Sequence, residues 1–86
     1  MTKKSNILIV ENEGIIAKDI ERVLVKFGYS VPAIVFSGEK AIQKTEECKP
    51  DLVLTEVSLD GKMDGIETAY RIQSLFNIPV IFLNIT

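Results

Sequence analysis

Short apolar runs alternate along this chain with segments in which apolar residues recur every three or four positions. The runs are typical of strands buried on both faces, and the wider spacing is typical of amphipathic helices. The alternation predicts the element order β-α-β-α-β-α-β. Units of this length form a parallel sheet with right-handed crossovers and helices on both faces. We therefore expect an α/β fold with a doubly wound sheet.

Four apolar runs are expected to form the strands, at residues 7–10, 31–36, 52–57 and 80–83. The first is short, continuous and rich in β-branched residues, which indicates burial on both faces. Pro32 lies near the start of the second run and favours an edge position, because proline cannot donate a ladder hydrogen bond.

Helices are expected in the three intervening segments. The first starts at Gly14 and ends before Gly28, a residue suited to the left-handed end of a helix. Ser37 is expected to cap the second, Pro50 to stop it, and Asp64 to cap the third. The apolar residues that give the first and third helices their spacing are Ile16, Ile20, Val23, Leu24 and Phe27, then Ile66, Ala69, Ile72, Leu75 and Phe76.

Length and composition restrict the classes of function. The chain has 86 residues, 47% of them hydrophobic, which predicts one globular domain over residues 1–86. Ten basic and twelve acidic residues leave no basic surplus for nucleic acid. A single cysteine and no histidine exclude an internal disulfide and the common zinc sites. The first apolar run is too short for a secretory signal or a membrane span, so we expect a cytoplasmic protein.

Polar side chains stand where the predicted strands end. Glu11 follows the first strand, Glu56 lies at the end of the third, and Asn84 ends the fourth. The carboxyl ends of parallel strands form the usual functional crevice of such sheets. A charge in an apolar strand is costly without a partner, and two converging carboxylates suit a hard cation such as Mg²⁺. Glu13 alone is better explained as an acidic residue at a helix start.

Four segments resemble the receiver domain of two-component response regulators. They are Ile7-Leu8-Ile9-Val10-Glu11-Asn12-Glu13, Asp51-Leu52-Val53-Leu54-Thr55-Glu56-Val57, Met63-Asp64-Gly65-Ile66-Glu67 and Ile78-Pro79-Val80-Ile81-Phe82-Leu83. The resemblance spans the chain in the family's order and implies a flavodoxin-like fold with strand order 2-1-3-4-5. It also implies a role in accepting a phosphoryl group from a histidine kinase onto an aspartate, with Mg²⁺ bound beside that aspartate.

Carried over by position, the resemblance implies an altered site. Glu11 keeps the charge of an acidic pair, but Asn12 replaces the aspartate that usually holds the metal. Glu56 occupies the position of the phosphoacceptor aspartate, and Ser58 that of the residue whose backbone carbonyl contacts the metal. Asn84 replaces the hydroxyl residue that moves to meet the phosphoryl group. The family's lysine follows a fifth strand, which this chain does not reach.

These changes predict a degenerate receiver. A neutral amide at position 12 weakens the attraction to a divalent cation. Glutamate reaches one methylene further than aspartate, and a misplacement of about 1 Å can cost roughly 100-fold in rate. Without the lysine, a fixed charge that stabilises the transferred oxygens is lost. We expect a binding module and no enzyme, poor or inactive in aspartyl phosphorylation, with Mg²⁺ binding weak or absent.

Two explanations of Glu56 stay open. Its carboxylate could imitate part of the charge of a phosphoaspartate, with the Asn84 amide donating a hydrogen bond to it, although a phosphoryl group carries more charge and more acceptor oxygens. The substitution could equally follow from drift after the chemistry stopped mattering, or from engineering of the acceptor.

The position of the last strand bears on partners. In the order 2-1-3-4, residues 80–83 form an exposed apolar edge of a truncated receiver, and such edges invite pairing with another chain. We expect a homo-oligomer, most simply a two-fold dimer. A histidine kinase or a downstream signalling protein is the other expected partner, and neither nucleic acid nor a membrane is expected.

Three other interpretations compete with this one. The chain could be a working Mg²⁺-dependent receiver, which beryllofluoride titration would show, or a structural fragment of a longer regulator. A dinucleotide-binding unit is disfavoured because the glycine fingerprint after the first strand is missing. Of the remaining residues, Cys48 is expected to fill space and Tyr70 to pack in its helix interface.

Overall fold

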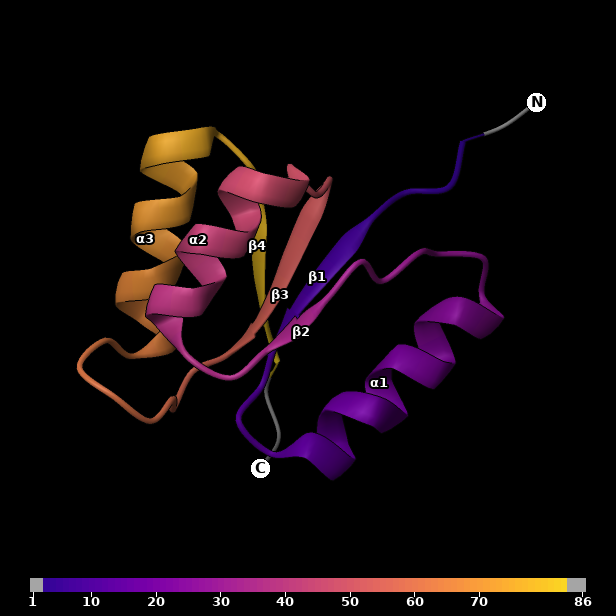
Figure 1. The fold of residues 1–86 in the computed structure, drawn as a ribbon, viewed down its shortest axis with the longest axis horizontal. Coiled ribbons are helices and arrows are strands. Elements are labelled where there is room, and N and C mark those ends of the chain that lie inside the picture. Colours follow the sequence, from indigo (N-terminus) through magenta and orange to yellow (C-terminus); the bar gives the residue numbers. More distant parts are fainter. Residues whose placement is uncertain (1–2, 84–86) are drawn as a thin grey trace.

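The computed structural model describes residues 3–83, in which the predicted order of elements is confirmed (Figure 1). The elements are β1 (Ile7–Val10), α1 (Gly14–Lys26), β2 (Ile34–Val35), α2 (Gly38–Cys48), β3 (Leu52–Glu56), α3 (Gly65–Phe76) and β4 (Val80–Leu83). Within residues 3–83, no helix combines the length and the apolar character needed to cross a bilayer.

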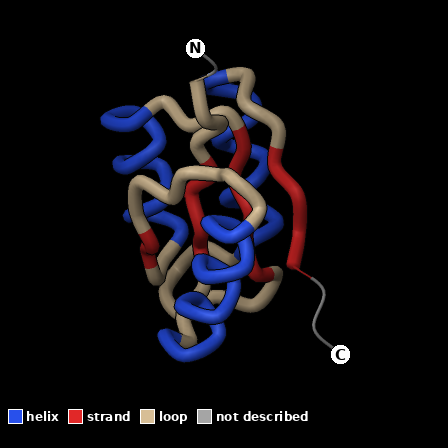
Figure 2. Tube along the Cα trace, turned by 90° about the vertical axis from the view of Figure 1, so that its right-hand side faces the viewer, coloured by secondary structure: helices blue, strands red, loops and turns tan. Residues whose placement is uncertain are grey.

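The strands form one parallel sheet in the order β2-β1-β3-β4, as predicted. Ile7 to Val10 pair with Leu52 to Thr55, and Val53 to Glu56 pair with Val80 to Leu83. Helices α2 and α3 cover one face of the sheet, and α1 lies on the other (Figure 1). The tube view shows the strands running between these helical layers (Figure 2). The architecture is the flavodoxin-like, doubly wound arrangement expected from the alternation.

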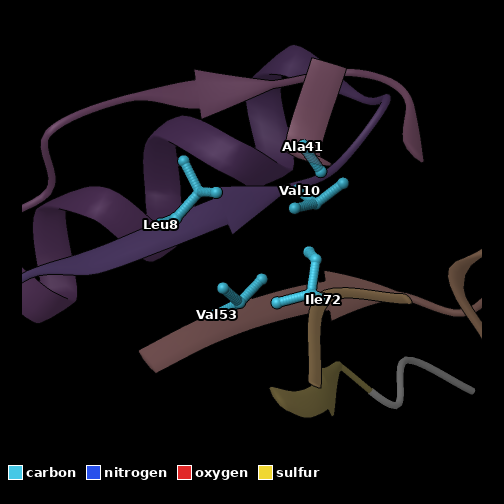
Figure 3. Packing of buried hydrophobic residues seen from close by; sticks show 5 residues of the cluster. All are labelled: Leu8, Val10, Ala41, Val53 and Ile72. Atoms are coloured by element: carbon cyan, nitrogen blue, oxygen red, sulfur yellow. The ribbon is translucent and has the colours of Figure 1, made fainter. Parts of the chain in front are cut away.

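The core lies between the sheet and α2 and α3. Leu8, Val10, Ala41, Val53 and Ile72 are fully buried and form one cluster (Figure 3). Each buried branched side chain contributes about 1.5–3 kcal/mol relative to its exposed state. All of β1 is buried because it has a strand on each side and helices above and below. This confirms the prediction of a strand buried on both faces.

The first helix is packed less completely than its apolar spacing predicted. Ala17 is buried, but Val23 and Phe27 are 52% and 73% exposed. Both lie on a flank that no element among residues 3–83 covers, so two of the five residues of the expected apolar stripe face solvent. The helix does end as predicted, with Gly28 at a φ of 95°.

Three further expectations need correction. The second strand is expected over residues 31–36, yet only Ile34 and Val35 form the strand, because the register shifts by one residue between the Asn6–Ser30 bridge and the Ile9–Ile34 pair, and Pro32 in between has no N–H to donate. The third strand ends at Glu56, one residue earlier than expected. Tyr70 is 73% exposed, since it lies on a flank of α3 turned away from the buried residues of that helix.

The predicted caps are present. The Ser37 hydroxyl accepts a hydrogen bond from the Lys40 amide at 3.2 Å, and the Asp64 carboxylate accepts one from the Glu67 amide at 2.9 Å. Each bond satisfies an amide that lacks a partner in the first helical turn. Cys48 is partly buried at the end of α2. The caps thus fix where α2 and α3 leave the sheet's carboxyl edge.

Candidate acidic site at the strand ends

Glu11 and Glu56 lie beside each other at the carboxyl edge of the sheet. Val10 of β1 pairs with Thr55 of β3, so the residues that follow them, Glu11 and Glu56, lie side by side in the same register. Glu11 follows β1 directly, and its amide donates to the Val35 carbonyl at 3.0 Å. Glu56 is the last residue of β3. The structure therefore brings together the two carboxylates that the sequence placed at neighbouring strand ends.

Glu11 is a buried acid, with 1% of its surface exposed. Its Oε2 accepts a hydrogen bond from the Glu13 amide at 3.0 Å, while Oε1 has no partner in the described part of the chain. Burial raises the pKa of the Glu11 carboxyl, the nearby charges of Glu56 and Glu13 raise it further, and the Glu13 amide opposes them. An unpartnered buried oxygen of this kind is an acceptor available to a cation or a donor.

Glu56 is half-buried and turns back onto its own backbone, where its Oε1 accepts the Val57 amide at 3.0 Å. The side chain borders a hollow of about 370 Å³ that opens over the strand ends. The hollow is lined by Asn12, Glu13, Ile16, Glu56 and Ser58. Of the four predicted metal ligands, Asn12, Glu56 and Ser58 line this hollow, whereas the buried Glu11 is not among its lining residues. Asn84 lies outside the described residues.

The donor set suits Mg²⁺ only in part. Glu11 and Glu56 supply carboxylate oxygens and Asn12 a neutral amide, whereas Mg²⁺ is usually bound by one or two carboxylates together with waters and phosphate oxygens. Over residues 3–83, no group of three or more acidic, cysteine or histidine side chains is placed to hold a metal. Glu11 and Glu56 together supply two carboxylates, which is less negative charge than three acids would provide.

Sequence reasoning missed one residue of the site. Gly65, the first residue of α3, lies so close to the end of β3 that a Cβ there would overlap the Glu56 carbonyl oxygen. The Asp64-Gly65 pair after a polar loop was the available signal, but it indicated only a cap and a helix start. A second hollow, about 860 Å³ between α1 and β2, was also missed, and it lies away from the acidic site.

A parallel 2-1-3-4 sheet with helices on both faces defines a flavodoxin-like domain, and the two acids lie at the carboxyl edge of that sheet. The chain belongs to the response regulator receiver domain family, whose family model matches residues 7–86. This match confirms the resemblance seen in the sequence. Receiver domains are signalling modules of two-component systems.

Individual relatives agree with this membership. The chain is 34% identical over 77 residues to the transcriptional regulatory protein PdtaR of Mycobacterium tuberculosis, covering 90% of this chain and 37% of that protein. A receiver domain of a modulated diguanylate cyclase from Desulfovibrio desulfuricans superimposes with a TM-score of 0.91 at 33% identity, covering 95% of this chain and 66% of that one.

A third relative is known in a complex. The anti-anti-sigma factor PhyR of Bartonella quintana, bound to the anti-sigma factor NepR, superimposes with a TM-score of 0.87 at 30% identity. The match covers 96% of this chain and 34% of the PhyR chain. The chain spans 30% to 38% of the length of the curated relatives it matches.

Proposed function

We propose that this receiver domain is a cytoplasmic signalling module that works through contacts with protein partners and is poor or inactive as a phosphoacceptor. The observation that carries the proposal is the glutamate at the end of β3. Glu56 stands where the family's acceptor aspartate is expected, and its Oε1 is engaged by the Val57 amide. A carboxylate that is both longer and internally hydrogen-bonded is poorly placed for in-line attack on phosphorus.

The electrostatics of the site support the same conclusion. Glu11 and Glu56 repel one another, and Asn12 adds no charge to attract Mg²⁺. A weakly bound cation would leave the negative charge of an incoming phosphoryl donor largely uncompensated. The expected consequence is slow phosphorylation even when a phosphodonor is abundant.

Protein partners are the remaining route for a signal. A histidine kinase or a downstream signalling protein is the proposed class of partner, in keeping with the PhyR–NepR complex of a structural relative. A second copy of this chain is also proposed, in a two-fold dimer. Ile81 and Phe82 of β4 are 52% and 41% exposed, and β4 is an edge strand among residues 3–83.

The phosphoacceptor part of the proposal is tested with Mg²⁺ and beryllofluoride, followed by amide resonances around residue 56. We expect no saturable shift for the native chain at millimolar Mg²⁺. A double variant, Asn12→Asp with Glu56→Asp, restores the missing charge and the shorter reach. It should bind Mg²⁺ at least about tenfold more tightly, since the added carboxylate is worth about 1.4 kcal/mol or more.

Glu13→Asp is the matched control, because it shortens another acid of the same hollow at a position to which the resemblance assigns no role in the site. It should behave like the native chain. Tight Mg²⁺-dependent beryllofluoride binding by the native chain would contradict the proposal. It would favour a working acceptor, the one alternative supported by an observation, namely the unpartnered buried Oε1 of Glu11.

A further inference from the structure

Each of the three helices begins on a glycine, and the space around these glycines differs. A Cβ on Gly14, at the start of α1, would meet nothing within 4 Å. A Cβ on Gly38, at the start of α2, would overlap the Thr68 hydroxyl of α3. A Cβ on Gly65, at the start of α3, would overlap the Glu56 carbonyl oxygen and lie 2.9 Å from Val57 Cα. Only the last of these contacts touches the acidic site.

The first turn of α3 rests on the peptide that joins Glu56 to Val57. The Gly65 amide donates to the Val57 carbonyl at 2.8 Å, which fixes the helix start against the end of β3. The Asp64 side chain caps the same turn through the Glu67 amide. Because Gly65 has no Cβ, its Cα can approach the Glu56 carbonyl directly.

The same peptide determines where the Glu56 carboxylate lies. Its carbonyl oxygen faces Gly65, and its N–H, on the opposite side of a trans peptide, donates to Glu56 Oε1 at 3.0 Å. A group that pushed the carbonyl would rotate the rigid peptide plane and turn the N–H away from the carboxylate. The side chain would then lose the bond that holds it.

We propose that Gly65 is a positioning residue for the Glu56 carboxylate. It acts through the Glu56–Val57 peptide, holding the side chain beside Glu11 at the mouth of the hollow. The inference rests on the proposed function only in taking Glu56 as the residue at the acceptor position. Its geometry requires neither Mg²⁺ nor a phosphodonor.

The test compares Gly65→Ala with Gly14→Ala and Gly38→Ala by amide hydrogen exchange and ¹H–¹⁵N spectra. In Gly65→Ala, the Val57 amide should exchange about tenfold faster and its proton should shift upfield, because the bond to a charged acceptor is lost. The Glu13 amide, which donates to Glu11, should be unchanged. Gly14→Ala should leave both amides unchanged. Gly38→Ala, a comparable overlap away from the site, should leave Val57 unchanged even if the domain is less stable.

A Glu56→Ala background separates positioning from general damage. There the Val57 amide already lacks its acceptor, so adding Gly65→Ala should cause little further change in its exchange. If Gly65→Ala fails to fold, two milder substitutions at helix caps provide the same comparison. Asp64→Ala loosens the cap of α3 and should accelerate Val57 exchange, whereas Ser37→Ala, the equivalent cap of α2, should not.

The proposal is overturned if Val57 responds equally to the Gly65 and Gly38 variants, or if Gly65→Ala acts the same with and without the Glu56 carboxylate. Equal responses to the two cap variants would overturn it as well. None of these readouts involves phosphorylation. A native chain that bound beryllofluoride tightly would contradict the proposed function and leave the role of Gly65 intact.

Discussion

At the scale of single residues, the site is defined by a carboxyl group that folding places in an unfavourable position. Glu11 is buried next to Glu56, and one of its oxygens lacks a partner. Burial raises the pKa of its carboxyl above the ordinary 4.5, so the folded chain holds the proton more tightly than the unfolded chain. As pH rises above 4.5 and through the raised pKa, Glu11 loses its proton in the folded chain, and the free energy of unfolding falls because the buried charge is unfavourable.

Glu11→Gln removes this charge and keeps an oxygen that can accept the Glu13 amide. We expect the variant to have a larger free energy of unfolding than the native chain at pH 7, and the advantage to shrink as pH falls toward 4.5. Urea titrations at several pH values measure the difference. Glu13→Gln, an exposed neighbour, controls for the loss of net charge. An advantage that did not depend on pH would contradict the argument.

At the scale of elements, the helices are tied to the sheet and to each other by close contacts at their first residues. Gly38 faces the Thr68 hydroxyl and lies near Met63, so α2 and α3 approach closely where both begin. Thr68 is fully buried and its hydroxyl donates to the Asp64 carbonyl at 2.7 Å. The contact leaves no room for a methyl group on α2.

Gly38→Ala should lower the free energy of unfolding by about 1–3 kcal/mol, the usual cost of overpacking. In a Thr68→Ala background the same substitution should cost at least about 1 kcal/mol less, because the overlapping hydroxyl is gone. Denaturant unfolding of the four chains gives the coupling energy directly. Gly14→Ala, with open space around it, should be neutral or slightly stabilising. Additive effects of the two substitutions would disprove the contact.

The order of the helices and strands and several of their ends could be predicted from the sequence, because the patterns that determine them are local. Apolar spacing gave the element order, Ser37 and Asp64 gave two helix starts, and Gly28 gave a helix end. The length of β2 and the exposure of Val23, Phe27 and Tyr70 could not be obtained in this way. They depend on which neighbours lie over a strand or flank, and spacing along one segment does not specify a neighbour.

The same distinction holds for the site. That Glu11 and Glu56 meet follows from the rule for parallel strand ends, and the structure brings them together. The part played by Gly65 depends on the approach of a helix start to a strand 9 residues earlier in the chain, which depends on loop geometry. The consequences of Asn12 and Glu56 for phosphorylation stay predictions.

At the scale of the whole sheet, β4 presents apolar side chains at an edge that no other strand among residues 3–83 covers. Ile81 is 52% exposed and lies on the face opposite α3, because its partner Leu54 alternates with the core residue Val53. An exposed apolar strand at an edge favours association with a second copy.

We expect light scattering after size-exclusion chromatography to show a mass above 9.6 kDa that rises with concentration. Ile81→Lys should shift the chain toward monomer with little change in stability, since the side chain is already half in solvent. Ile66→Lys, at an equally exposed apolar position on α3, should keep the native behaviour. A monomer at all concentrations would exclude the dimer.

The central place of β1 has a consequence for how the domain is made. Its ladder partner β3 begins 45 residues after β1 does, and Asn6 is tied to Asp51 by a 2.7 Å hydrogen bond. Chains emerge from the ribosome N-terminus first, at about 5–20 residues per second. The most apolar strand of the molecule therefore waits several seconds without its main partner. Glu11 likewise gains its neighbour Glu56 only after β3 has been made, so the acidic site is completed late in the synthesis of the domain.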